Sequence, residues 1–296
     1  MQNAFSVDVE DYFQVGAFAK IISPKDWDSW SPHVVNNTQR ILEILASAPQ
    51  PVKATFFVLG WVAERFPTLV PEIVRQGHEI ASHGYGHQLV YTLTEDEFRN
   101  DIRTTRKILQ DQSGQPIFGY RAPSFSIVKR TPWAHRVLVE EGYTYDSSVF
   151  PIYHDVYGSP DAPREIHTIQ TEAHSEQAGT ILEFPPAVIT RFGKNIPIGG
   201  GGYFRFFPYF LTARWLKEVN RLGKPFVFYM HPWEIDTEQP RIPGAPLKSR
   251  FRHYLNLKRT ADRLKKLLQD FSFTTVHEIV RAQTWGRHTI SAQVCQ

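Results

Sequence analysis

The sequence is poor in cysteine, in net charge and in long apolar runs. Its single cysteine, Cys295, excludes a disulfide bond within the chain. No apolar run reaches the roughly 18 residues expected of a membrane span, and residues 1–5 lack the basic and apolar regions of a signal peptide. The formal net charge of +3 is too small to indicate nucleic-acid binding. We therefore expect a cytoplasmic protein, and peripheral attachment to a membrane complex stays open.

The rest of the composition is typical of a globular protein. Hydrophobic residues make up 42% of the chain and charged residues 21%, which is ample material for a core. A length of 296 residues suits one large barrel or two smaller domains. Aromatic residues are plentiful, at 14%. They can stack on sugar rings or fill a large core, and composition does not distinguish the two.

Two histidines four residues apart, His83 and His87, form the first candidate site. Imidazole is a common ligand for divalent metals, and this spacing lets both rings reach one ion. Gly84 and Gly86 disfavour a regular helix, so we expect a tight loop after a strand at 79–82. Two surface or core imidazoles would give the same pattern. A metal site also needs a carboxylate.

Carboxylates are found near the N-terminus, where residues 5–10 alternate between apolar and polar as a strand does. Asp8 and Glu10 would share one face of that strand, and Asp11 follows directly. Two acids on one face repel each other unless a cation or solvent compensates them. The segment is therefore either part of a metal site or a solvated edge strand.

Strand-like and helix-like segments alternate through about residue 150, which is typical of parallel βαβ units. Such units can close into a barrel, whose functional residues lie at the carboxyl ends of the strands. The candidate polar residues all occur at such ends: Asp8, Glu10, Asp11, His83, His87, Arg121, Asp146 and His231. We predict an α/β fold, a distorted (β/α) barrel of about seven parallel strands.

Three further segments carry local predictions. Ser31-Pro32 predicts the start of a helix. The glycine run 199–202 and the aromatics after it predict a flexible loop, or a lid over an extended ligand. Residues 248–268 hold eight lysines and arginines and predict one long basic helix. That helix is either solvated or in contact with anionic lipid or an acidic glycan.

Five motifs in order over residues 5–233 resemble the polysaccharide deacetylase (NodB homology) family, carbohydrate esterase family 4. Ser6-Val7-Asp8-Val9-Glu10-Asp11 is similar to its acidic motif, written TFDDG in most members. The segments 83–87 and 121–125 match the spacing of H-S/T-x-x-H and R-x-P-x-Y/F. Asp146-Ser147 matches the start of the fourth motif, and Phe228-Tyr229-Met230-His231 matches the fifth. Details such as DVEDYFQ and MHPWE are most similar to the subgroup linked to exosortase (PEP-CTERM) exopolysaccharide gene clusters.

The resemblance implies metal-dependent removal of N-acetyl groups from the amino sugars of a polysaccharide or its lipid-linked precursor, in exopolysaccharide biosynthesis. Asp8 would be the general base, His231 the general acid, and Arg121 the cation that keeps the base ionised. One divalent ion, zinc by expectation, would bind Glu10, His83 and His87. The residues expected to contact substrate are Tyr85, Pro123, Phe125, Asp146, Tyr229 and Trp233. Residues 1–233 would form the catalytic barrel, and 234–296 a helical C-terminal extension packed on it.

Several alternatives stay open at this stage. If Glu10 and Asp11 replace the family's adjacent acids, Glu10 is the base and Asp11 the ligand; strand alternation favours Asp8 and Glu10 instead. The same scaffold could be an allantoinase-like or cyclic-imide hydrolase, or a barrel that binds glycan without catalysis. The expected partner is an N-acetylated glycan, and contact with a membrane-bound polysaccharide synthesis complex stays open.

Overall fold

The computed structural model describes residues 1–154, 157–171 and 179–283, so Cys295 lies outside it. Its main sheet contains seven parallel strands in the order β10-β1-β2-β3-β4-β5-β7; β6 is antiparallel to β7 at one edge, and an eighth parallel strand, β11, pairs with β1 beside this path. The strands are β1 (Gln2–Val9), β2 (Thr55–Val58), β3 (Glu79–Ser82), β4 (Gly119–Tyr120), β5 (Tyr145–Asp146), β6 (His167–Gln170), β7 (Thr180–Glu183), β10 (Val227–Met230) and β11 (Ser272–Thr274), with a separate hairpin of β8 (Val188–Arg191) and β9 (Lys194–Pro197). This is the predicted α/β fold with about seven parallel strands.

The ring of strands closes through irregular backbone pairing beside β10. Single parallel bridges join Pro186 to Val227 and Gly200 to Tyr229, and the Tyr229 amide donates to the Gly199 carbonyl at 2.7 Å. Gly200 has φ 128°, and a Cβ there would lie 1.8 Å from the Tyr229 oxygen. Only glycine fits this approach. The glycine run predicted as a flexible loop therefore closes the barrel and then enters α6.

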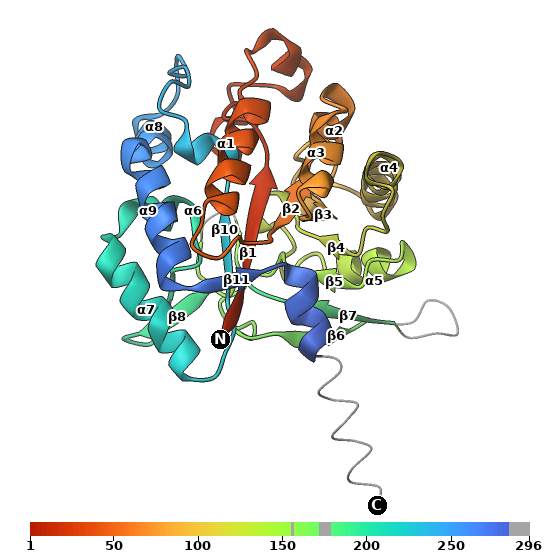
Figure 1. Cartoon of the computed structure of the whole chain (residues 1–296). Helices are drawn as coiled ribbons and strands as arrows, with labels where there is room; N and C mark the ends of the chain where they lie inside the picture. Colours follow the sequence, from red (N-terminus) through yellow and green to blue (C-terminus); the bar gives the residue numbers. More distant parts are fainter. Residues whose placement is uncertain (155–156, 172–178, 284–296) are drawn as a thin grey trace, which may run out of the picture.

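Helices cover the outside of the strands (Figure 1). They are α1 (Val34–Ala46), α2 (Gly60–Arg65), α3 (Leu69–Arg75), α4 (Glu95–Ser113), α5 (Trp133–Glu140), α6 (Gly201–Phe206), α7 (Tyr209–Arg221), α8 (Leu247–Tyr254) and α9 (Leu257–Asp270), with 3-10 turns η1 (Gly16–Phe18), η2 (Pro24–Ser29), η3 (Val90–Thr92), η4 (Pro123–Phe125) and η5 (Pro232–Ile235). A capping box of Thr94 and Glu97 opens α4. No helix in the described ranges has both the length and the apolarity needed to cross a bilayer.

Alternation along β1 separates two buried environments. Phe5, Val7 and Val9 point outward into the main core beneath the helices, whereas Ala4 belongs to a smaller cluster inside the barrel. Ser6 and Asp8, at the same parity as Ala4, therefore also point into the barrel. Figure 1 shows β1 in the middle of the molecule with the N-terminus at its lower end, so the carboxyl end of β1, near which Asp8 lies, is at the opposite end.

Two helix predictions are wrong in their details. Helix α1 begins at Val34 rather than at Ser31-Pro32, because its first amides are bound by the distant Asp11 carboxylate. The long basic helix is two helices, α8 and α9, separated at Asn256, whose φ of 55° is incompatible with a continuous helix. Since β11 pairs with β1, residues after 233 also add a strand to the sheet; the domain division at that residue stays a prediction.

Candidate active site

A cavity of about 480 Å³ opens at the carboxyl ends of the strands. Its floor holds Asp8 and Glu10 from the end of β1, His83 and His87 after β3, and His231 after β10. The structure thus brings together polar residues that lie more than 200 positions apart in the sequence, as the barrel prediction required.

Glu10, His83 and His87 form a compact set of metal-ligand atoms, all within 4.8 Å of one another. The Nδ1–H of His83 donates to the Arg121 carbonyl at 2.8 Å, so its Nε2 lone pair is free to bind a cation. Burial lowers the pKa of His83 to about 4, which keeps that ring neutral.

Glu10 carries the negative charge of this set. Burial opposes ionisation of its carboxyl group, but His87 and His231 outweigh that effect and lower its pKa to about 2. Glu10 Oε2 lies 2.6 Å from His87 Nε2 without normal hydrogen-bond geometry, so this buried oxygen accepts no hydrogen bond from a described residue. Two imidazoles and a carboxylate with an unsatisfied oxygen fit a divalent cation such as zinc.

Asp8 lies beside this set and is paired with Arg121. Arg121 Nη1 donates to Asp8 Oδ1 at 2.6 Å, and the guanidinium is completely buried. The other Asp8 oxygen, Oδ2, lies 3.9 Å from His231 Nε2. Asp8 therefore has one oxygen held by a cation and one directed towards the His231 ring.

Besides its pairing with Asp8, Arg121 has four contacts that hold it in one orientation. It donates to the Ser6 hydroxyl and to the Ser147 carbonyl and hydroxyl, and it lies 4.1 Å over the Phe57 ring. A buried arginine that is held in this way leaves the carboxylate bound to it little freedom to move.

His231 forms a chain of contacts that the sequence did not reveal. Its Nδ1 lies 2.5 Å from Glu234 Oε1, and Arg205 Nε donates to Glu234 Oε2 at 2.8 Å. Burial disfavours the charged imidazolium, but Glu10 and Glu234 outweigh it and raise the pKa of His231 to about 9. His231 is therefore protonated near neutral pH, with its Nε2 proton facing the cavity.

Comparison with known proteins matches two successive regions of the chain to protein families. Residues 27–145 match the family described as Polysaccharide deacetylase, and residues 147–281 match the Domain of unknown function (DUF3473). Residues 27–145 thus carry the sequence of a polysaccharide deacetylase domain. Both matched regions build the cavity, because the first supplies His83, His87 and Arg121 and the second supplies Arg205, His231 and Glu234.

Curated relatives match over short stretches. A peptidoglycan-N-acetylglucosamine deacetylase of Bacillus cereus is 42% identical over 84 residues, which are 28% of this chain and 30% of that protein. A peptidoglycan deacetylase of Helicobacter pylori is 29% identical over 96 residues, which are 32% of each chain. The matched segment is thus about a third of each relative's length.

Two solved structures share the fold of this chain. A Mycobacterium smegmatis protein assigned as a polysaccharide deacetylase has a TM-score of 0.59 at 22% identity, covering 95% of this chain and 90% of that one. Puue allantoinase has a TM-score of 0.58 at 16% identity, covering 94% and 88%. At these identities the likeness shows the barrel alone and does not distinguish glycan from ureide substrates.

Three of the six predicted substrate contacts line the cavity, namely Phe125, Tyr229 and Trp233. Trp233 also donates from Nε1 to Glu10 Oε1 at 3.1 Å and stacks between His231 and His253. Three residues that line the cavity, His87, Ser124 and Phe125, have left-handed backbone. Non-glycine residues tolerate this conformation mainly where the surrounding structure imposes it.

The other three predicted contacts do not line the cavity. Tyr85 donates its hydroxyl to Glu64, and Pro123 is buried beneath the loop that follows β3. Asp146 is fully buried; it contacts His135 at 3.1 Å and accepts a hydrogen bond from Ser148. Because Ser148 in turn accepts from the Ala122 amide, Asp146 supports the strand end that carries Arg121 instead of meeting substrate.

Asp11, the alternative carboxylate ligand, binds backbone amides with its side chain. Its Oδ2 accepts from the His33 and Val34 amides at 2.7 and 2.9 Å, and its Oδ1 accepts from the Tyr12 amide. These contacts satisfy amides at the start of α1, so neither Asp11 oxygen faces the ligand set.

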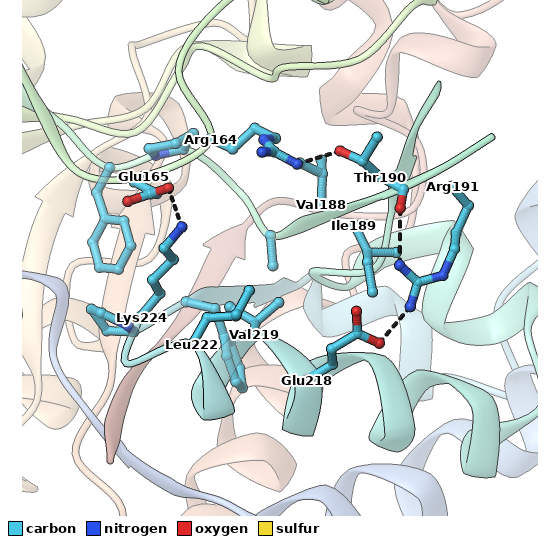
Figure 2. Close-up of a pocket in the computed structure, with 15 residues that line it drawn as sticks. Arg164, Glu165, Val188, Ile189, Thr190, Arg191, Glu218, Val219, Leu222 and Lys224 are labelled. Carbon is cyan, nitrogen blue, oxygen red and sulfur yellow. Dashed lines mark hydrogen bonds and ion pairs between the residues drawn. The ribbon is translucent and has the colours of Figure 1, made fainter. Parts of the chain in front are cut away.

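A second cavity, of about 150 Å³, lies between β8, α7 and the start of β10 (Figure 2). Lys224 pairs with Glu165 at 2.5 Å, Arg191 pairs with Glu218, and Arg164 donates to the Thr190 hydroxyl. Each charged residue drawn there already has a polar partner within the pocket, so this cavity offers little to a charged or reacting ligand.

Proposed function

We propose that this chain is a metal-dependent hydrolase that removes N-acetyl groups from the amino sugars of a polysaccharide or its lipid-linked precursor. The observation that carries the proposal is the convergence on one cavity of a metal-ligand set, an arginine-paired carboxylate and a protonated histidine. The proposed glycan substrate rests on the match to the deacetylase family. The proposed role in exopolysaccharide synthesis rests on the resemblance of DVEDYFQ and MHPWE to the exosortase-linked subgroup.

Amide hydrolysis needs an activated water, a stabilised oxyanion and a protonated leaving amine. A divalent ion on Glu10, His83 and His87, zinc by expectation, would act as the Lewis acid that activates water and polarises the acetyl carbonyl. Asp8 accepts the water proton on Oδ2, while Arg121 keeps Oδ1 occupied and the group ionised.

His231 completes the reaction from the opposite side. Its Nε2 donates a proton to the sugar nitrogen as the amide C–N bond breaks, which yields acetate and a free amine. Glu234 holds Nδ1 and favours the imidazolium, so the acid is charged before substrate arrives. Arg205 fixes Glu234 in turn.

The first experiment measures acetate release from N-acetylglucosamine oligomers and lipid-linked saccharides, together with the metal content of the purified protein. Turnover of small ureides without acetate release would favour the allantoinase-like alternative. Bound metal or glycan with no turnover at all would favour a non-catalytic barrel.

The second experiment assigns the acids. Asp8→Asn should bind metal and be nearly inactive, whereas Glu10→Gln should lose metal, because only Glu10 belongs to the ligand set. Asp11→Asn is the matched control and should keep both metal and activity. An active Asp8→Asn variant combined with metal loss in Asp11→Asn would overturn the assignment and make Glu10 the base.

A further inference from the structure

Exposed hydrophobic side chains gather around the mouth of the catalytic cavity. Among the described residues, nine large hydrophobics are exposed, and five of them belong to segments that line or border this cavity. We call these five the mouth patch: Ile21, Tyr153, Phe206, Leu247 and Phe251. Monomeric soluble surfaces seldom concentrate exposed apolar groups in this way unless something binds there.

The placement of each member follows from its neighbours. Phe206 and Phe251 line the cavity themselves. Leu247 and Tyr153 directly precede the lining residues Lys248 and His154.

The remaining member, Ile21, follows η1, whose Phe18 ring lies 4.7 Å from the His253 ring of α8. Figure 1 shows α8 and the chain after β1 at the same end of the molecule. The segments that carry the mouth patch therefore all contribute residues to the lining of this cavity or directly adjoin such residues.

Helix α8 presents both apolar and basic groups at this opening. Leu247 and Phe251 lie one turn apart and are 81% and 60% exposed. Lys248, Arg250 and Arg252 are also exposed, and the helix contains no acid. None of these three cations forms an ion pair with a described residue, in contrast to the arginines of α4 and α5.

The combination of apolar and basic groups argues against two other occupants, a sugar and a second copy of the chain. Sugar rings stack on aromatic faces but gain little from the aliphatic Leu247 and Ile21. A second copy of the chain meeting through a twofold axis would bring the unpaired cations of two α8 helices together. Anionic lipid headgroups above an apolar layer complement both the charges and the hydrophobic side chains.

We propose that the mouth patch and the cations of α8 dock the protein on an anionic lipid bilayer, with the catalytic cavity opening at the headgroup layer. Arg205 links this surface to the site, because its Nη1 donates to the carbonyls of Arg252, His253 and Leu255 while its Nε binds Glu234. The docking helix is thus fixed to the residues that hold His231. A substrate would be taken from the membrane surface.

The test is sedimentation of the full chain with vesicles of phosphatidylcholine alone or with about one third phosphatidylglycerol. The test variant is the double substitution Leu247→Ser/Arg250→Gln, whose positions do not line the cavity. The matched control is Arg221→Gln/Leu222→Ser at the exposed end of α7. Each positive charge near an anionic surface strengthens binding about fivefold, so the test variant should bind at least about tenfold more weakly than wild type.

Wild type and the α7 control should bind the anionic vesicles, weaken with salt, and bind neutral vesicles poorly. Equal binding of the test variant, or no binding of wild type to either vesicle, would overturn the proposal. Tight binding of a soluble polyuronate without vesicle binding would instead assign the surface to an acidic glycan. The readout needs no turnover, so it stands apart from the outcome for deacetylation, and hydrolysis of a small soluble substrate should be equal in both double variants.

Discussion

Replacing Glu234 by glutamine tests the contact that helps to raise the pKa of His231, the proposed general acid. Glu234 holds His231 Nδ1 at 2.5 Å, and its charge helps to raise the pKa of His231 to about 9. A hydrogen bond to a charged group is worth about 1.5–3 kcal/mol, and one pKa unit corresponds to about 1.4 kcal/mol. Glu234→Gln should therefore lower the pKa of His231 by about one to two units.

The sign of the effect on activity follows from the role proposed for His231, that of general acid. The protonated imidazole is the active form, so activity is present below the pKa of His231 and is lost as the pH rises through it. The alkaline limb of the pH–rate profile should therefore move to lower pH in the variant. Well above the wild-type pKa, a shift of one to two units lowers the protonated fraction, and with it the rate, by about 10- to 100-fold.

The assay is acetate release from an N-acetylglucosamine oligomer across the pH range, with metal content and thermal unfolding measured on the same samples. Asp236→Asn is a matched control, since Asp236 Oδ2 lies 2.6 Å from His33 Nδ1 in the same segment, outside the catalytic cavity. An alkaline limb that stays in place for Glu234→Gln, or that moves equally for Asp236→Asn, would refute the reasoning. Arg205 keeps three backbone carbonyl partners in the variant, so we expect the fold to survive.

Three further variants have distinct expected outcomes. His87→Ala should lose metal without loss of secondary structure by circular dichroism, since His87 lies in a mouth loop; wild-type metal content would contradict its place in the ligand set. His231→Ala should lower turnover by about 10²–10⁴-fold with metal retained, and a variant that keeps the alkaline limb would show that His231 is structural. Asp11→Asn should lower the free energy of unfolding in urea by about 1–2 kcal/mol, because one carboxylate oxygen that binds the amides at the start of α1 is replaced by a donor; unchanged stability would contradict this capping role.

The sequence predicted the fold and much of the site because those features are written in local patterns. Period-2 alternation separated Asp8 and Glu10 from Val7 and Val9, and in the structure the two acids line the cavity whereas the two valines lie in the main core. A capping box predicted the start of α4, and alternating strands and helices predicted the parallel sheet. Each of these inferences depends only on residues that are close in the sequence.

The errors arise where a distant partner decides the local structure. Ser31-Pro32 is a reasonable helix start by itself, but Asp11 binds the first amides of α1 and the helix begins at Val34. The basic segment 248–268 is rich in helix formers, yet it bends at Asn256, whose side chain donates to the Arg205 carbonyl. Tertiary contacts of this kind override local propensity.

By itself, then, the sequence determined the chemistry that the cavity can hold: two imidazoles, acids with alternating spacing, one arginine and a late histidine. Only the tertiary structure decided how these groups are used. It set Asp11 aside as a helix cap, placed Asp146 behind Arg121, and gave His231 the partner Glu234. The physical reason is that a pKa and a hydrogen bond depend on distances of a few ångströms, which are set by the closure of the barrel and not by spacing along the chain.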